Sequence, residues 1–559
     1  MNRSSKNIIL IIILALGILG LIFTISSAKS NNESKIPSMG ENMMGNPPEK
    51  PDGENMMGNP PEKPDGENMM GNPPEMPNTT KETSTTTYLL LGLESSLISL
   101  ILFYLVMSKF NEKSFGETFK TTSKILIYAV SSVALIVALV WGSNSLIGSS
   151  SSNMNNPNGS TNNSTSYKGK TEIKEATTIS SGSYESTTAD ENAILATDKV
   201  DVNISSIEVN KTGDSAGGDN TSFYGTNSAI LAKSGVTLNL SNVNVTTNAT
   251  GSNGVFSYGG SATTNNSSSD GTTVNISDST IVTTKDNSGG IMTTGGGIMN
   301  ASNLKITTAG TSSAAIRSDR GGGTVNVDGG TYKTTGKGSP AIYSTANITV
   351  KNAELISEAS EGAIIEGKNS ITLDNVTLTD TNNILNGQST TYKNIFLYQS
   401  MSGDAEVGCS TFTASNSTII TNKGDTLYVT NTTSTINLTN NTIINNDATG
   451  NFLRIQADSW GKSGSNGGIV TLLLNNQTIK GNIVVDSIST LDMSLTSSNF
   501  EGAINTSNTA KSIKLTLDKD SKITLTKDSY ISSLDNADLT NSNINFNGHK
   551  LYVDGKAIN

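Results

Sequence analysis

The residues best suited to chemistry are a small charged group in the C-terminal region. Arg317, Asp319 and Arg320 lie close together in the chain, and Arg454 follows much later. A lyase needs a base, commonly Arg or Lys, beside Ca²⁺ held by several carboxylates, and a hydrolase needs clustered Asp pairs. The chain contains no Asp-Asp dipeptide. We therefore expect surface ion pairs or loop anchors and no catalytic residue. Three or more carboxylates converging beside an Arg or Lys would instead favour an enzyme.

Other reactive or ligating side chains are isolated. Asp214 and Asp219 in a Gly-rich loop could bind Ca²⁺ weakly, but they lack EF-hand spacing, so we expect no metal site and no cofactor. The single histidine, His549, is expected in a surface turn, and the single cysteine, Cys409, is expected to be a small buried residue. Trp460 in a predicted loop could stack on a sugar if exposed, or cap an insertion if buried.

A short repeated pattern must position these residues. An apolar residue is followed by one variable residue, Asn or a substitute, two variable residues and another apolar residue. The central residues are Asn242, Asp278, Asn303, Gly329, Asn352, Asn375, Asn416, Asn440, Asn476 and Asn541, with weaker copies at Ser206, Ser497 and Lys519. Asn, Asp and Gly tolerate left-handed backbone dihedrals, so we expect a turn at each position. Stacked asparagine amides could then hydrogen-bond as a ladder.

Many neighbouring copies lie about 21–26 residues apart, which is the length of one coil of a parallel β-helix. Segments such as 236–240 alternate apolar and polar residues, as strands with one buried face do. The sequence therefore predicts an all-β solenoid, a right-handed parallel β-helix, over residues 169–559. The charge of −11 and the lack of clustered basic residues argue against nucleic acid as a partner.

Apolar runs before this region predict two or three transmembrane α-helices. Residues 1–28 hold either a retained helix, which we favour, or a signal peptide, and residues 88–148 hold a helical hairpin. Lysines fill the short loop between the hairpin helices, and none follows until Lys168. The positive-inside rule therefore predicts a multi-pass protein of the cell membrane, with a cytoplasmic N-terminus and an extracytoplasmic C-terminal domain. We expect Glu94, inside the first helix of the hairpin, to snorkel or to bond to a neighbouring helix.

Two polar segments connect these elements. Residues 29–87 contain a 13-residue repeat rich in Met and Pro, which predicts a semi-extended loop outside the cell. Its paired methionines could bind Cu(I), although a spacer is the simpler interpretation because no His or Cys accompanies them. Residues 149–168 are rich in Ser and Asn and predict a flexible linker.

The C-terminal pattern resembles the pectate-lyase-like superfamily of right-handed β-helices, and more closely bacterial adhesin-like or autotransporter-passenger-like surface proteins. The resemblance is sharpest over residues 466–472, 481–486, 517–526 and 547–555. It implies a non-catalytic surface protein that contacts glycans or other cell surfaces. The same fold also hosts polysaccharide lyases and glycoside hydrolases, and a purely structural envelope protein is a third alternative.

Overall fold

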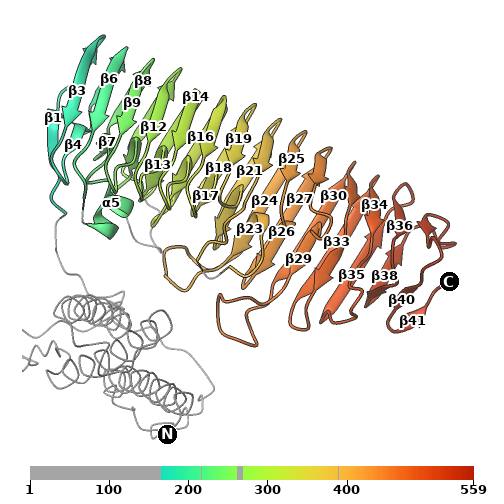
Figure 1. Ribbon diagram of the computed structural model, residues 1–559. Helices are drawn as coiled ribbons and strands as arrows, with labels where there is room; N and C mark the ends of the chain where they lie inside the picture. The colour runs from blue at the N-terminus through green and yellow to red at the C-terminus, as the bar shows by residue number, and fades with distance from the viewer. Residues whose placement is uncertain (1–164, 216, 261–268, 388) are drawn as a thin grey trace, which may run out of the picture. The chain divides into compact units, whose positions relative to one another are not determined.

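The structure of the protein, a computed structural model, describes residues 165–559 apart from residue 216, residues 261–268 and residue 388. Residues 163–559 form one compact unit. Within its described part, short strands succeed one another along the unit, and one α-helix, α5 (Gly218–Tyr224), lies beside them (Figure 1). These strands form a stack of parallel sheets, an arrangement consistent with a parallel β-helix.

Sheet A contains 12 strands, and the chain passes through sheet B between each of them and the next. We call one strand of sheet A, together with the sheet B strands that follow it, a coil. The strands of sheet A are β1 (Gly169–Ile173), β4 (Asn192–Ala196), β7 (Ile230–Lys233), β10 (Val255–Tyr258), β13 (Ile291–Thr294), β15 (Ile316–Ser318), β17 (Ile342–Ser344), β20 (Ala363–Glu366), β23 (Lys393–Tyr398), β26 (Asp425–Thr430), β29 (Leu453–Ile455) and β32 (Ile483–Val485).

Sheet B contains 22 strands, which form a first and a second segment in most coils. The first segments are β2 (Thr177–Ile179), β5 (Asp201–Ser205), β8 (Thr237–Ser241), β11 (Thr273–Ser277), β18 (Asn347–Lys351), β21 (Ser370–Asp374), β24 (Cys409–Ser415), β27 (Thr433–Thr439), β30 (Ile469–Asn475), β33 (Thr490–Thr496), β35 (Ser512–Leu517) and β38 (Ser533–Asn536). The second segments are β3 (Gly182–Ser186), β6 (Ile207–Lys211), β9 (Asn244–Thr247), β12 (Thr280–Thr283), β19 (Glu354–Ser357), β22 (Thr377–Asp380), β25 (Thr418–Thr421) and β28 (Thr442–Asn445). Two long strands, β14 (Gly297–Thr308) and β16 (Gly323–Thr334), run through both segments.

The last coils form smaller sheets. One contains β31 (Thr478–Lys480), β34 (Asn499–Gly502), β36 (Lys522–Leu525) and β39 (Ile544–Asn545). The other contains β37 (Ser529–Ile531), β40 (Leu551–Val553) and β41 (Lys556–Ala557). β41 pairs with β40 in the antiparallel sense, and it therefore covers a strand edge that would otherwise be open to other chains.

Alternation along each strand builds the core. In β5, Val202 and Ile204 are buried, whereas Asp201 and Asn203 face outward. In-register pairing stacks Val202, Leu238 and Val274 of successive coils into one column about 4.8 Å apart. Each such side chain contributes on the order of 1.5–3 kcal/mol when it is removed from water, so stability accumulates coil by coil.

A left-handed residue follows the first segment of sheet B and leads into the second segment or, at Asn476 and Ser497, into β31 and β34 of the smaller sheet. Ser206, Asn242, Asp278, Asn303, Asn352, Asn375, Asn416, Asn440, Asn476 and Ser497 have φ between 47° and 56°, and Gly329 has φ 77°. Their backbones bond to the next coil, as when the Asn242 N–H donates to Ser277 O at 3.1 Å. Side chains add a ladder: Asn375 Nδ2 donates to Asn352 Oδ1 at 2.8 Å. The asparagines selected by their spacing therefore lie in one column from Asn242 to Asn476.

Two predicted positions depart from this column. Asn541 has φ 55°, but its N–H donates to Asp538 O within its own turn, because residues 537–543 make a longer connection between β38 and β39. Lys519 is not left-handed; Asp518 in the same turn accepts the Ser497 N–H through its carboxylate at 2.9 Å instead. The prediction that these two residues belong to the column was wrong, because the turns contain more residues towards the C-terminal end.

Cys409 also differs from expectation. It is exposed, because it opens β24 on the outward side of the alternation, and its Sγ lies 3.5 Å from Thr435 Oγ1. In the part of the chain that the structure describes, no helix is long and apolar enough to cross a membrane. The predicted helices in 1–28 and 88–148, the 29–87 repeat, Glu94 and most of the 149–168 linker lie outside the described residues.

Candidate functional site

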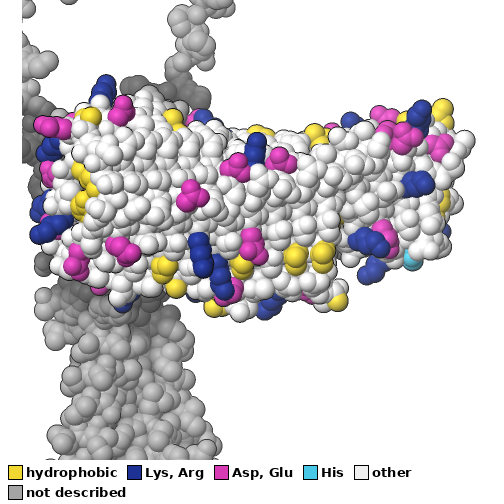
Figure 2. Space-filling model, turned by 90° about the horizontal axis from the view of Figure 1, so that it is seen from above, with side chains coloured by type: hydrophobic (Ala, Val, Ile, Leu, Met, Phe, Trp, Pro, Cys, Tyr) yellow, Lys and Arg dark blue, Asp and Glu magenta, His cyan; other side chains and the backbone are white. Residues whose placement is uncertain are grey.

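The outer face of sheet A carries a continuous column of large side chains. Along β7, Ile230 and Ala232 belong to the main core, whereas Leu231 belongs to a separate cluster on the outside. The pairing register places the equivalent outward residues in one column: Leu195, Leu231, Phe256, Met292, Arg317, Tyr343, Ile364, Phe396, Tyr428 and Arg454. By contrast, charged side chains are scattered among uncharged ones on the face drawn in Figure 2.

A cleft of about 360 Å³ opens on this outer face. Arg317 of β15 and Tyr343 of β17 contribute from the sheet, and Phe223 contributes from α5. The connections into and out of β23, residues 381–392 and 399–408, add Asn386 and Asp404. We call this the sheet A cleft. Its walls are therefore insertions that meet on sheet A although they are far apart in sequence.

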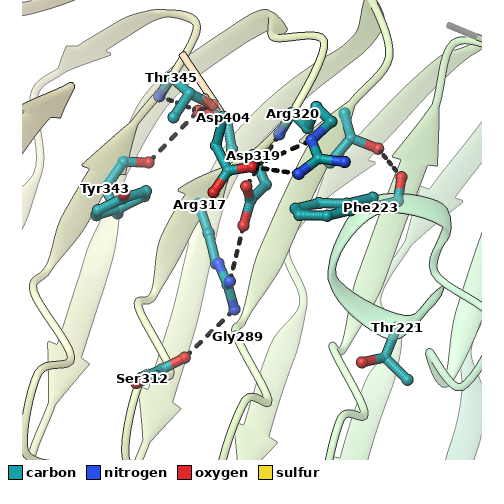
Figure 3. Close-up of polar contacts among 12 residues, drawn as sticks. Thr221, Phe223, Gly289, Ser312, Arg317, Asp319, Arg320, Tyr343, Thr345 and Asp404 are labelled. Carbon is teal, nitrogen blue, oxygen red and sulfur yellow. Dashed lines mark hydrogen bonds and ion pairs between the residues drawn. The ribbon is translucent and has the colours of Figure 1, made fainter. Parts of the chain in front are cut away.

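Two Arg–Asp pairs organise one side of the sheet A cleft (Figure 3). Arg317 Nη2 lies 2.9 Å from Asp319 Oδ2, and both side chains are nearly buried, at 12% and 10% exposure. Arg320 Nη2 lies 2.6 Å from Asp404 Oδ1, and its guanidinium carbon lies 4.0 Å from the centre of the Phe223 ring. Because Asp404 is 84 residues further along the chain, this pair fastens the 399–408 connection across several coils.

Burial controls the protonation of Asp319. Desolvation raises the pKa of this carboxyl, the Arg317 guanidinium lowers it, and the nearby charge of Asp404 raises it again. The net direction is upward, so the ion pair only partly offsets the loss of water around the carboxylate. Asp319 therefore holds a proton at a higher pH than an exposed aspartate does.

A second carboxyl lies next to the cleft, at the end of β20. Glu366 is 1% exposed and accepts hydrogen bonds from the Tyr343, Tyr398 and Ser400 hydroxyls, with the Tyr398 oxygen at 3.1 Å. Burial raises its pKa more than these hydroxyl donors lower it. The Glu366 carboxyl and the three hydroxyl groups bonded to it thus fill the space between sheet A and residues 399–408.

Arg454 and Trp460 lie further along the same face. Arg454 Nε lies 2.5 Å from the buried Asp425 carboxylate, and Tyr428 beside it donates its hydroxyl to Asp458 Oδ2 at 2.8 Å. The Trp460 ring packs on Tyr398 at 4.8 Å between centres, and its indole N–H is buried with no partner in the described part of the chain. Trp460 is half-buried, so its ring mainly holds the 456–468 insertion against sheet A.

All five residues selected as surface contacts therefore lie on or beside one face. Arg317, Asp319 and Arg320 meet at the sheet A cleft, and Arg454 and Trp460 lie beyond it along sheet A. Sequence reasoning missed Phe223, Tyr343, Glu366, Tyr398 and Asp404. The alternation of side chains along a strand could have identified Tyr343. The apolar triplet Ala341-Ile342-Tyr343 marks a strand of sheet A, and every second residue in such a strand points away from the core.

The other residues singled out from the sequence lie elsewhere or have other roles. Asp219 is in the first turn of α5 rather than in a loop, and it lines the sheet A cleft. Asp214 accepts the Thr250 N–H at 2.7 Å, so it fastens a turn. His549 lies in a turn near the C-terminus, 3.9 Å from Asp528. Within residues 165–559, gaps excepted, no three His, Cys, Asp or Glu side chains are grouped as a metal site requires.

Comparisons with protein-family models, with curated proteins and with solved structures found no match to this chain.

Proposed function

We propose that the protein is a membrane-anchored, surface-exposed β-helix that contacts glycans through the sheet A cleft without catalysing a reaction. One observation carries the proposal: aromatic rings and arginines, among them Tyr343, Phe396 and Arg317, lie side by side on the outer face of sheet A, where insertions build a cleft. Insertions mounted on a rigid scaffold commonly carry binding functions.

The chemistry of the cleft suits a sugar. Each arginine at the cleft is paired with an aspartate, so neither attracts a highly charged polymer strongly. Tyr343 and Phe223 supply ring surface, and Asn386 supplies amide donors and acceptors for hydroxyl groups. A neutral or weakly charged glycan offers both complementary parts, a face of C–H groups and a rim of hydroxyls.

The placement outside the cell rests on the N-terminal sequence. Its apolar runs and lysine distribution support a multi-pass anchor with the β-helix on the extracytoplasmic side. The resemblance of residues 466–555 supports the right-handed pectate-lyase-like form and the adhesin-like role in this proposal, and the parallel sheet stack is consistent with a parallel β-helix.

A glycan array probed with the full chain, together with a cell-adhesion assay, tests this function. Asp219→Ala combined with Asn386→Ala removes two cleft-lining polar groups without touching the core, and it should abolish cell adhesion and the array signals of the glycans that the cleft binds. Asp520→Ala, an exposed carboxyl in the turn before β36, is the matched control and should leave them unchanged. Silence of the wild type in both assays would remove the proposal and leave an enzyme or a purely structural envelope protein.

A second candidate is a polysaccharide lyase or glycoside hydrolase. Asp219, Asp319 and Asp404 line one cleft beside Arg317, although among the described residues they are not grouped closely enough to hold a metal ion. Asp319, with its raised pKa, would be the proton donor of such a site. Incubation with polysaccharides, followed by assays for reducing ends and for unsaturated ends, tests this candidate. Product that disappears in Asp319→Asn would support the enzyme, and no product would exclude it for those substrates.

A further inference from the structure

A furrow of about 730 Å³ runs along the outer face of sheet B, away from the sheet A cleft. It crosses β5, β8, β11, β14, β16 and β18, which lie side by side in successive coils (Figure 1). Outward-facing side chains of these strands line it together with the backbone-side surface of the core residues between them, and none of these residues lines the sheet A cleft. We call it the Asn furrow.

Five asparagines form a continuous chain of amides along the Asn furrow. Asn239 Nδ2 donates to Asn203 Oδ1 at 3.0 Å, and Asn275 Nδ2 donates to Asn239 Oδ1 at 2.8 Å. Asn300 and Asn326 continue the series at 2.8 and 2.9 Å. An amide has two N–H groups and two acceptor positions, so each asparagine inside the chain keeps one of each for a ligand. Because the chain fixes the side chains beforehand, a ligand does not have to order them.

The charge of the Asn furrow selects against ionic ligands. Asp328 and Lys351 are the ionisable residues among those that line it, and both lie at the β16–β18 end. Serines such as Ser241 and Ser277 alternate with the asparagines along the strands and add hydroxyl groups. A ligand rich in uncharged hydroxyls matches this lining, whereas an anionic polymer would find no counter-charges along most of its length.

The repeat distance distinguishes a glycan from a peptide. Adjacent strands lie about 4.8 Å apart, and their pairing is in register, so equivalent amides recur at that step. An extended peptide advances about 3.3 Å per residue and presents the same face every second residue, at about 6.7 Å, so it loses phase within a few coils. A pyranose unit in an extended glycan is about as long as one coil step, and it carries hydroxyl groups on both edges of its ring, so each unit can meet the amides even where successive units are turned over.

We propose that the Asn furrow binds an extended, neutral glycan that lies along the β-helix with one sugar unit per coil. Five successive units each meet one free amide N–H and one free amide oxygen, and a sixth meets Thr349 of β18. This site is independent of the proposed function of the sheet A cleft, and it makes the β-helix able to hold a polymer along its length.

Calorimetric titration of the full chain with linear hexamers of β-1,4-linked glucose, xylose and N-acetylglucosamine tests the proposal. At least one hexamer should bind, and its affinity should rise steadily from the dimer to the hexamer as further coils are engaged. Asn239→Leu combined with Asn300→Leu should weaken binding about tenfold or more, because the Leu side chains offer no hydrogen bond. Ser241→Gln, which fills the furrow and leaves the amides in place, should cause a similar loss without disturbing the fold.

Asn437→Leu is the matched control. Asn437 lies in the same outward column further along sheet B, beyond the furrow, and its amide donates to Thr413 Oγ1 at 3.1 Å. This variant should bind as the wild type does. The proposal is overturned if no hexamer binds, if the dimer binds as tightly as the hexamer, or if Asn437→Leu loses as much affinity as the furrow variants. The Asp219→Ala, Asn386→Ala variant of the sheet A cleft keeps the hexamer affinity, so the two proposals fail separately.

Discussion

Asp380 places an uncompensated carboxyl inside the β-helix, and replacing it with asparagine should stabilise the protein in a pH-dependent way. Its side chain is fully buried at the end of β22. Oδ1 accepts the Asn382 N–H at 2.8 Å, but Oδ2 has no partner among the described residues. Burial, with a smaller contribution from the charge of Glu361, raises the pKa of Asp380 to about 8.

The sign and size of the effect follow from linkage. In the unfolded chain the pKa of Asp380 returns to about 3.9, so folding takes up a proton between that pH and the folded value near 8. The folded state is therefore not penalised below pH ~4 and loses stability as the pH rises, by about 1.4 kcal/mol per pH unit. At pH 7 the accumulated penalty is about 4 kcal/mol.

Asp380→Asn removes the titration but keeps an oxygen for the Asn382 N–H. The new amide N–H₂ lacks a partner, but so does the O–H of the protonated wild-type carboxyl at the same position. The variant should therefore have about the stability of the wild type near pH 4 and should gain about 4 kcal/mol relative to it by pH 7. Chemical unfolding followed by circular dichroism, with hydrogen exchange over residues 377–398 to report local opening, measures the difference.

Asp520→Asn is the control for this experiment, because Asp520 is an exposed carboxyl. Its stability should follow the wild type at each pH. If the Asp380→Asn and wild-type curves ran parallel between pH 4 and pH 8, Asp380 would not be an unpaired buried acid, and the reasoning would fail.

Three further predictions concern other positions. Asn375→Ala should cost about 2–3 kcal/mol, from the left-handed backbone and the lost bond to Asn352, whereas Asn375→Gly should cost about 1 kcal/mol; equal losses in urea unfolding would argue against backbone strain. Arg454→Ala should cost about 3 kcal/mol because it leaves the Asp425 carboxylate buried without its cation, and a thermal unfolding temperature equal to that of the wild type would contradict this. Cys409 should react completely with a maleimide in the folded protein, and protection until denaturant is added would show that it is covered.

The repeated turn could be predicted from the sequence because the residues that cause it lie within the turn itself. A left-handed residue between two short strands restricts the choice to Asn, Asp, Gly and, less readily, Ser, so the pattern appears in the sequence itself. The prediction failed at Asn541 because asparagine suits any left-handed turn, including one outside the column. Cys409 misled because its type favours burial, whereas strand parity places it outward.

The cleft was harder to foresee because its parts are not local. Arg320 and Asp404 come from different coils, and only the stacking register and the length of the 399–408 connection bring them together. Glu366 reads as an ordinary strand end, and its hydroxyl partners come from three other segments. The charged group around Arg317 was identified from residue types alone, but its neighbours required the fold.

The one-residue turn between the two segments of sheet B has a consequence for how such a protein can change. A left-handed corner repeated at a fixed step cannot admit extra residues without breaking the amide column that passes through it. The connections to and from sheet A carry no such constraint, and the helix α5 and the long insertions occur there. Insertions beside sheet A can therefore change while the opposite corner keeps the spacing of every coil constant. Sequence variation and the conserved geometry of the coils are thus expected on different sides of the β-helix.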